Sequence, residues 1–152
     1  MSGYTVVREY PYSVGEVWDV LTSPEWVGRW TTSGRGGRPE GFRPVPGAAF
    51  RFVGKPVAGW AGVVHCRVVE VDAPHFLHYT WKGDEESDDV TDVTYRLEST
   101  PAGTRFTWRH TGFTGAGGLA LSALLGRVRR RMLDEGLPPA LAAHRAERTT
   151  AQ

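Results

Sequence analysis

The last quarter of the chain, residues 117 to 148, carries the pattern that most limits the possible folds. Its apolar residues recur at steps of three and four, and this spacing places them along one side of an α-helix. Arginines gather on another side of the same helix. Because a helix with one apolar side is stable only when that side is covered, the rest of the chain must supply an apolar surface. The apolar residues are Leu121, Leu124, Leu125, Val128 and Met132.

This helix is expected to be interrupted once. Gly136 is followed by Pro138 and Pro139, which have no backbone N–H to donate and should kink or break the helix. Leu137 and Leu141 resume the apolar side beyond that point. We therefore expect two helical segments that cover the same surface.

That surface is expected to be an antiparallel sheet, because the preceding residues alternate as strands and are separated by turns. Residues 4–10, 48–53, 60–71 and 75–82 are predicted strands, and two more follow before residue 113. The alternation breaks within residues 68–71, which predicts a β-bulge. The residues predicted to face inward are Phe50, Phe52, Leu77, Tyr79, Trp81, Val93, Tyr95, Leu97, Phe106, Trp108 and His110. Val64, Cys66 and Val68 share one side of their strand and His65 and Arg67 the other, and the sequence leaves open which of the two sides faces inward.

Two short helices and a loop interrupt the strands near the N-terminus. A capping-box pattern at residues 13–16 starts the first helix, and a proline at the first helical position starts the second. Residues 31–47 contain too many glycines and prolines for a regular element, so we expect a mobile loop with one short strand near Phe42. That loop would gate the interior beside Trp26 and Trp30.

Composition limits the class of protein. A chain of 152 residues suits one domain, here residues 1–148 with a frayed tail at 149–152. The single cysteine, Cys66, cannot form an internal disulfide, no signal-peptide pattern opens the chain, and nowhere do eighteen apolar residues run together. We therefore expect a cytoplasmic α+β protein that does not enter membranes. A net charge of +1 offers no general attraction to nucleic acid.

Three local patterns resemble one known family. They are the opening from Val17 to Trp30, the run 69–81, and the run 103–113 with the closing helix after it. Together they are similar to the AHSA1-like proteins, named after the activator of Hsp90 ATPase homologue, in the START-like or Bet v 1-like (SRPBCC) superfamily. The resemblance implies a helix-grip fold, in which a curved sheet of six or seven antiparallel strands holds a long C-terminal helix and two short N-terminal helices close one end.

The resemblance specifies the fold, but it does not specify a single activity. Its superfamily spans carriers, cyclases, stress proteins and self-sacrificing resistance proteins. The sequence departs from the family pattern at Gly136-Leu137, where the family commonly has a Gly-Trp pair. In the family, that tryptophan would form part of the bottom of the cavity.

Aromatic rings on a concave sheet opposite a helix favour binding of a small hydrophobic molecule, aromatic or polyketide-like, in a cavity between the two layers. Each ring taken alone is better explained as ordinary core, and only the set as a whole favours a ligand. The candidate ligand-binding residues are Trp26, Trp30, Phe50, Phe52, Tyr79, Trp81, Tyr95, Trp108, His110, Leu124 and Val128.

His110 is the polar residue expected to face inward. A buried histidine is more often a hydrogen-bonded part of the core. The catalytic alternative makes it the general acid or base of a polyketide cyclase or dehydratase, with Tyr79 or Tyr95 nearby. A further alternative is a self-sacrificing resistance protein against a reactive natural product. No cofactor is expected, and the scattered histidines of the strands lack the spacing of a metal site.

Four arginines, at positions 127, 129, 130 and 131, are expected to form a solvated helix face. Nucleic acid is not the expected partner, because no aromatic residues are interleaved with these arginines. The same group could dock a protein, but nothing in the sequence indicates one. We expect a monomer or a weak dimer.

Overall fold

The structure is a computed structural model and describes residues 2–32, 37–56, 62–84, 86 and 88–151. Trp60, expected in the third strand, and residues 33–36 of the expected gate loop lie outside this part. The elements in chain order are β1 (Ser2–Tyr10), α1 (Val14–Thr22), α2 (Pro24–Thr31), β2 (Arg38–Glu40), β3 (Ala49–Val53), β4 (Val63–Asp72), β5 (Phe76–Lys82), β6 (Thr91–Thr100), β7 (Gly103–Phe113), α3 (Gly115–Arg131), the π-helical turn η2 (Met132–Gly136) and α4 (Leu137–Ala151).

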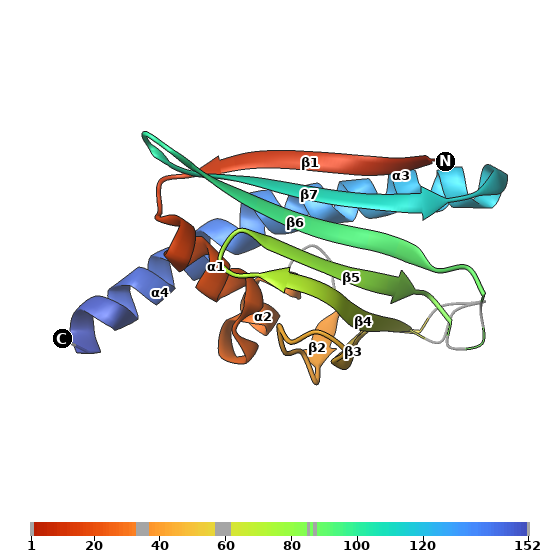
Figure 1. The fold of residues 1–152 in the computed structure, drawn as a ribbon, viewed down its shortest axis with the longest axis horizontal. Helices are drawn as coiled ribbons and strands as arrows, with labels where there is room; N and C mark the ends of the chain where they lie inside the picture. Colours follow the sequence, from red (N-terminus) through yellow and green to blue (C-terminus); the bar gives the residue numbers. More distant parts are fainter. Residues whose placement is uncertain (1, 33–36, 57–61, 85, 87, 152) are drawn as a thin grey trace.

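The seven strands of the described residues form one antiparallel sheet in the order β1-β7-β6-β5-β4-β3-β2. Figure 1 shows α3 running behind β1 and β7, with α1 and α2 at one end of the sheet. The α+β helix-grip fold predicted from the sequence is therefore confirmed. The predicted bulge is confirmed too, since the register shifts between Val68 and Glu70. The inward residues predicted for β5, β6 and β7 are buried.

The short strand expected near Phe42 lies instead at β2, which pairs with β3. Glu40 at the end of β2 is held by Arg38 and Arg51, at 2.8 and 2.6 Å. Gly41 then adopts a φ of 74°, which turns the chain out of the strand. Phe42 follows in a turn and packs edge-on against Phe50, with ring centroids 4.8 Å apart.

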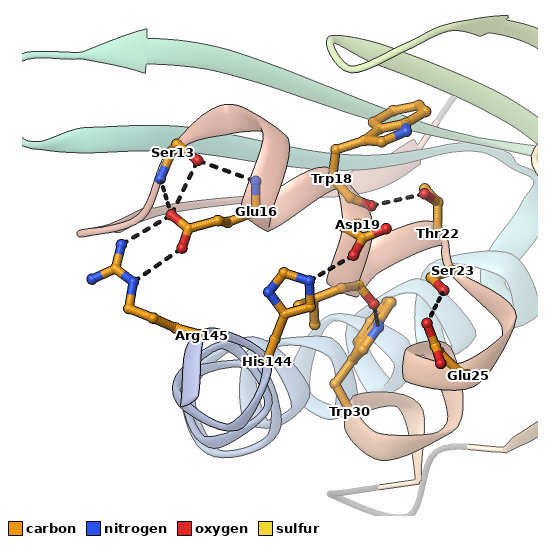
Figure 2. A network of polar contacts seen from close by, with 11 residues as sticks. Ser13, Glu16, Trp18, Asp19, Thr22, Ser23, Glu25, Trp30, His144 and Arg145 are labelled. Atoms are coloured by element: carbon orange, nitrogen blue, oxygen red, sulfur yellow. Dashed lines mark hydrogen bonds and ion pairs between the residues drawn. The ribbon is translucent and has the colours of Figure 1, made fainter. Parts of the chain in front are cut away.

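The predicted capping box starts α1 and also anchors α4 (Figure 2). The Glu16 N–H donates to the Ser13 hydroxyl at 3.2 Å, and the Ser13 N–H donates to the Glu16 carboxylate at 2.9 Å. The same carboxylate accepts two hydrogen bonds from Arg145 of α4, and this pairing lowers the pKa of Glu16 to about 2. One turn along α1, Asp19 pairs with His144 at 2.6 Å.

The predicted interruption of the closing helix is η2. Here the Leu137 N–H donates to the Met132 carbonyl, five residues back, and Pro138 has no N–H to donate. The Leu133 carbonyl therefore loses both of its possible helical donors, and it accepts a hydrogen bond from the Tyr10 hydroxyl at 2.7 Å instead. Beyond η2, α4 packs chiefly against α1 and α2, which corrects the expectation that both segments cover the same sheet.

The side of α3 that faces the sheet is not the leucine side predicted from the sequence. Ser122 and Gly126 are buried, whereas Leu121 and Leu124 are 38% and 53% exposed. The prediction that these two leucines face the sheet is therefore wrong, and Leu124 does not line the interior. The physical reason is close approach, because a Cβ added at Gly126 would stand only 3.5 Å from the Tyr4 ring of β1. Small side chains, rather than leucines, allow the helix to come this near.

Candidate functional site

Arg129, one of the four arginines expected in solvent, turns into the interior. Its guanidinium carbon lies 4.1 Å from the ring centroid of Trp108, which is a cation–π contact. Its Nη1 donates to the Met132 sulfur at 3.0 Å, a weak acceptor. Its Nε is buried and has no hydrogen-bond partner within the described residues. The prediction of a solvated face is thus wrong for Arg129, while the other three arginines of the group are exposed.

No carboxylate of the described residues forms an ion pair with Arg129. Its neighbours are three tyrosines and a thiol: Tyr4, Tyr79, Tyr95 and Cys66. Burial lowers the pKa of Arg129, but the tyrosine oxygens outweigh it and the pKa is raised overall. The guanidinium therefore keeps its charge inside a ring-lined interior.

The two central tyrosines leave a hydrogen-bond donor unused. The Tyr79 and Tyr95 hydroxyl oxygens are 3.0 Å apart, so one donates to the other. The second hydroxyl hydrogen makes no further side-chain hydrogen bond within the described residues. Burial raises the pKa of both tyrosines, which keeps them neutral at physiological pH. The indole Nε1 of Trp108 is also buried without an acceptor in the described structure.

His110 belongs to a chain of hydrogen bonds that fixes its tautomer. The Thr91 hydroxyl donates its one hydrogen to the Trp81 carbonyl at 3.1 Å, so it must accept from His110 Nε2 at 2.7 Å. In the neutral imidazole, Nδ1 then accepts from the Tyr4 hydroxyl at 3.2 Å. The chain runs from Tyr4 through His110 and Thr91 to the backbone of β5.

This arrangement limits what His110 can do chemically. Burial, helped by the charge of Arg129, lowers the pKa of His110 to about 3. The imidazole is therefore neutral at physiological pH, and both of its nitrogens have partners. The geometry is that of a hydrogen-bonded core histidine, and a proton-transfer role would require one of these bonds to open.

Cys66 lies on β4 facing the interior, where burial raises the pKa of its thiol and keeps it protonated. Across the described ranges, no three His, Cys, Asp or Glu side chains come together as metal ligands would. The helices of the same ranges include none with the length and apolar character needed to cross a bilayer.

The predicted ligand-binding residues divide into groups by exposure. Five are at most 1% exposed: Trp30, Tyr79, Tyr95, Trp108 and His110. The first four pack on one another in ring contacts, whereas His110 packs against Tyr4, Trp81 and Phe113. Trp26 is 4% exposed and contacts His144 rather than an open rim, so it and Trp30 do not border a mouth in this structure. Some surface stays accessible at Phe50 and Trp81, at 5% and 9%, and more at Phe52 and Val128, which are partly buried. Leu124 lies on the outer side of α3.

Sequence reasoning missed Arg129, its neighbour Tyr4 and the pairing of His144 with Asp19. A signal for Arg129 was present. Ser122, Gly126, Arg129, Leu133 and Gly136 follow one another at steps of four and three, so they form one helical stripe. The small residues Ser122 and Gly126 in that stripe mark the side that approaches the sheet, and Arg129 lies on it.

Solved structures share this fold. They include protein MLL2253 from Mesorhizobium loti, with 24% identity over 92% of this chain and 96% of that chain and a TM-score of 0.76. CalU16 from Micromonospora echinospora has 19% identity over 97% and 83%, with a TM-score of 0.63. DynU16, from the dynemicin biosynthetic locus, has 24% identity over 88% of this chain and 48% of that chain, with a TM-score of 0.62. At these identities the likeness shows the fold alone.

A search among curated proteins found no match. A family model described as activator of Hsp90 ATPase homolog 1-like protein matches residues 11–122, from the turn before α1 to the first half of α3. This match covers most of the chain. The chain therefore belongs to the activator of Hsp90 ATPase homolog 1-like family.

Proposed function

We propose that the protein binds one small hydrophobic molecule, aromatic or polyketide-like, between α3 and the inner face of β3, β4 and β5. The observation that carries the proposal is a difference in packing along the interior. The inward side chains of η2 and of the start of α4, such as Leu133, Leu137 and Leu141, have no exposed surface. On β3, β4 and β5, apolar and aromatic side chains such as Trp81, Val64 and Phe52 retain some.

The retained surface suits an apolar guest. α3 packs chiefly against β1 and β7 and not against the other edge of the sheet, so the inner faces of β3 to β5 depend less on helix contact. Burying about 200 Å² of apolar ligand surface there is worth roughly 5 kcal/mol before the costs of ordering are subtracted. That gain supports micromolar binding only if rings also stack, and Trp81 is a ring of this face that keeps accessible surface.

Comparison supports the chemical class of the guest. Membership of this family fits a fold that commonly holds hydrophobic ligands. The similarity to DynU16, a protein from a biosynthetic locus, is compatible with a natural product as the ligand. Neither finding names the molecule.

The enzymatic alternative has less support. A cyclase or dehydratase using His110 needs a free ring nitrogen, and here both nitrogens are bonded and the pKa is about 3. Steady turnover of a polyketide that His110→Ala slows at least tenfold would favour the enzyme. Stoichiometric cleavage of the chain by a reactive natural product would favour the sacrificial role.

Titration of aromatic natural products, such as hydroxyanthraquinones, against tryptophan fluorescence tests the proposal. We expect saturable 1:1 quenching, together with a rise in the midpoint of thermal unfolding. Trp81→Leu should weaken binding about fivefold, because an aromatic contact is worth roughly 1 kcal/mol. Trp18→Leu, on α1 and outside the proposed site, is the matched control and should leave the affinity unchanged. Unsaturable quenching without any thermal shift would contradict the proposal.

A further inference from the structure

The interior around Arg129 contains hydrogen-bond donors that have no acceptors. The donors are the Nε of Arg129, the indole Nε1 of Trp108 and one hydroxyl hydrogen of the Tyr79–Tyr95 pair. Two acceptors of the same region are already used, since His110 Nδ1 accepts from Tyr4 and the Trp81 carbonyl accepts from Thr91. The Tyr4 hydroxyl also lies within hydrogen-bond reach of the Arg129 guanidinium, but the Nε of Arg129 is left without a partner.

The electrostatic balance points the same way. Burying a charge without a counterion is unfavourable, and a cation–π contact offsets only part of that cost. Within the described residues Arg129 has the Trp108 ring but no carboxylate, and the phenols and thiol beside it are neutral. The chain therefore holds a positive charge whose counterion it does not supply.

Arg129 also keeps contact with the region proposed for the ligand. Although its Nε is buried, part of the side chain remains accessible. It projects from the α3 face that carries Ser122 and Gly126, toward Trp108 on β7 and near Cys66 on β4. A guest between α3 and these strands would lie against the guanidinium.

We infer that the ligand is an aromatic acid or enol whose negatively charged oxygen pairs with Arg129. This inference rests on the function proposed above and adds the charge of the guest. A guanidinium presents its N–H groups as a planar fork that matches a carboxylate or the two oxygens of a β-dicarbonyl enolate. A neutral hydrocarbon of the same shape would bury the cation further and gain nothing from the unused donors.

Two fluorescent probes with the same ring system test the inference. They are 1-anilinonaphthalene-8-sulfonate, which carries an anionic group, and N-phenyl-1-naphthylamine, which does not. We expect Arg129→Gln to raise the Kd of the sulfonate at least tenfold and that of the neutral amine less than twofold. Arg129→Lys, which keeps the charge but not the fork, should give a smaller loss for the sulfonate. Arg127→Gln removes an exposed charge from the same helix and should change neither Kd by twofold.

A competition on the unmodified protein covers the case in which the variant does not fold. 2-Naphthoate should displace N-phenyl-1-naphthylamine at least tenfold more effectively than the neutral 2-acetonaphthone. Equal displacement, or equal loss of both probes in an Arg129→Gln protein that unfolds as cooperatively as the parent, would overturn the inference and show that Arg129 is only a structural cation. In that outcome the proposed function stands, because the neutral probe still binds. Failure of both probes to bind the unmodified protein would overturn the proposed function and the inference together.

Discussion

One continuous run of helix behaves in opposite ways at its two ends. At the α4 end, made by α1, α2, η2 and α4, the leucines at 133, 137 and 141 are fully buried. At the α3 end, made by α3 with the facing parts of β1, β7 and β3 to β5, Leu121 and Leu124 face outward and Arg129 faces in. The difference teaches that the spacing of apolar residues shows where a helix lies in the sequence. Which face of that helix turns toward the sheet depends instead on which side chains are small enough to allow close contact.

The two ends also differ in how their buried and pairing charges are matched. At the α4 end, Glu16 is paired with Arg145 and Asp19 with His144 (Figure 2). At the α3 end, Arg129 has no carboxylate partner among the described residues. We therefore regard the α4 end as the support of the fold and the α3 end as the site.

The largest expected effect is a difference between leucines on the two ends. Leu133→Ala should destabilise the protein by about 2–5 kcal/mol, because it removes a fully buried side chain and leaves a cavity. Leu124→Ala should cost less than about 0.5 kcal/mol, because that side chain is half exposed. Urea unfolding of both variants measures the contrast. Similar losses would show that α3 buries the face predicted from its leucines.

A smaller effect is expected at η2. Tyr10→Phe removes the hydroxyl that bonds the Leu133 carbonyl and leaves that buried oxygen without a donor. We expect a loss of about 1–3 kcal/mol of unfolding free energy. Tyr12→Phe keeps the ring that Arg145 covers and serves as the control, with little change. A Tyr10→Phe protein as stable as the parent would mean that the π-helical turn satisfies its own carbonyls.

The smallest expected effect is a pH dependence at the α4 end. The pKa of Glu16 is about 2 in the folded chain against an ordinary 4.5, because Arg145 holds the charged form. A lowered pKa stabilises the fold above pH 4.5, and that stability is lost as the pH falls from about 4.5 toward 2. Glu16→Gln should therefore flatten the decline in unfolding midpoint across this window. Glu147→Gln, whose contact with Arg29 joins two exposed side chains, should retain the full decline.

Much of the sheet was predictable from the sequence, because apolar and polar residues alternate along a strand whose one face is buried. The inward residues of β5 to β7, the bulge at Val69 and the capping box at Ser13 were all expected and are present. Family resemblance supplied the order of these elements, and the family model supports it.

The site was less predictable because it depends on the rotation of α3. Two stripes on that helix have equally good helical spacing, one containing Leu121 and Leu124 and the other Ser122, Gly126 and Arg129. Hydrophobicity favours the first stripe, but the small residues of the second permit the approach to Tyr4. Long-range pairs such as Asp19 with His144 leave no local signal at all.

The most direct test of the account is to follow indole N–H signals by ¹H–¹⁵N NMR during titration with 1-anilinonaphthalene-8-sulfonate. Trp81 and Trp108 lie on strands of the α3 end, whereas Trp26 packs against His144 at the α4 end. We predict that the Trp81 and Trp108 signals shift saturably and that the Trp26 signal does not move. Shifts at Trp26 with Trp81 and Trp108 unchanged would place the guest at the wrong end and contradict the account.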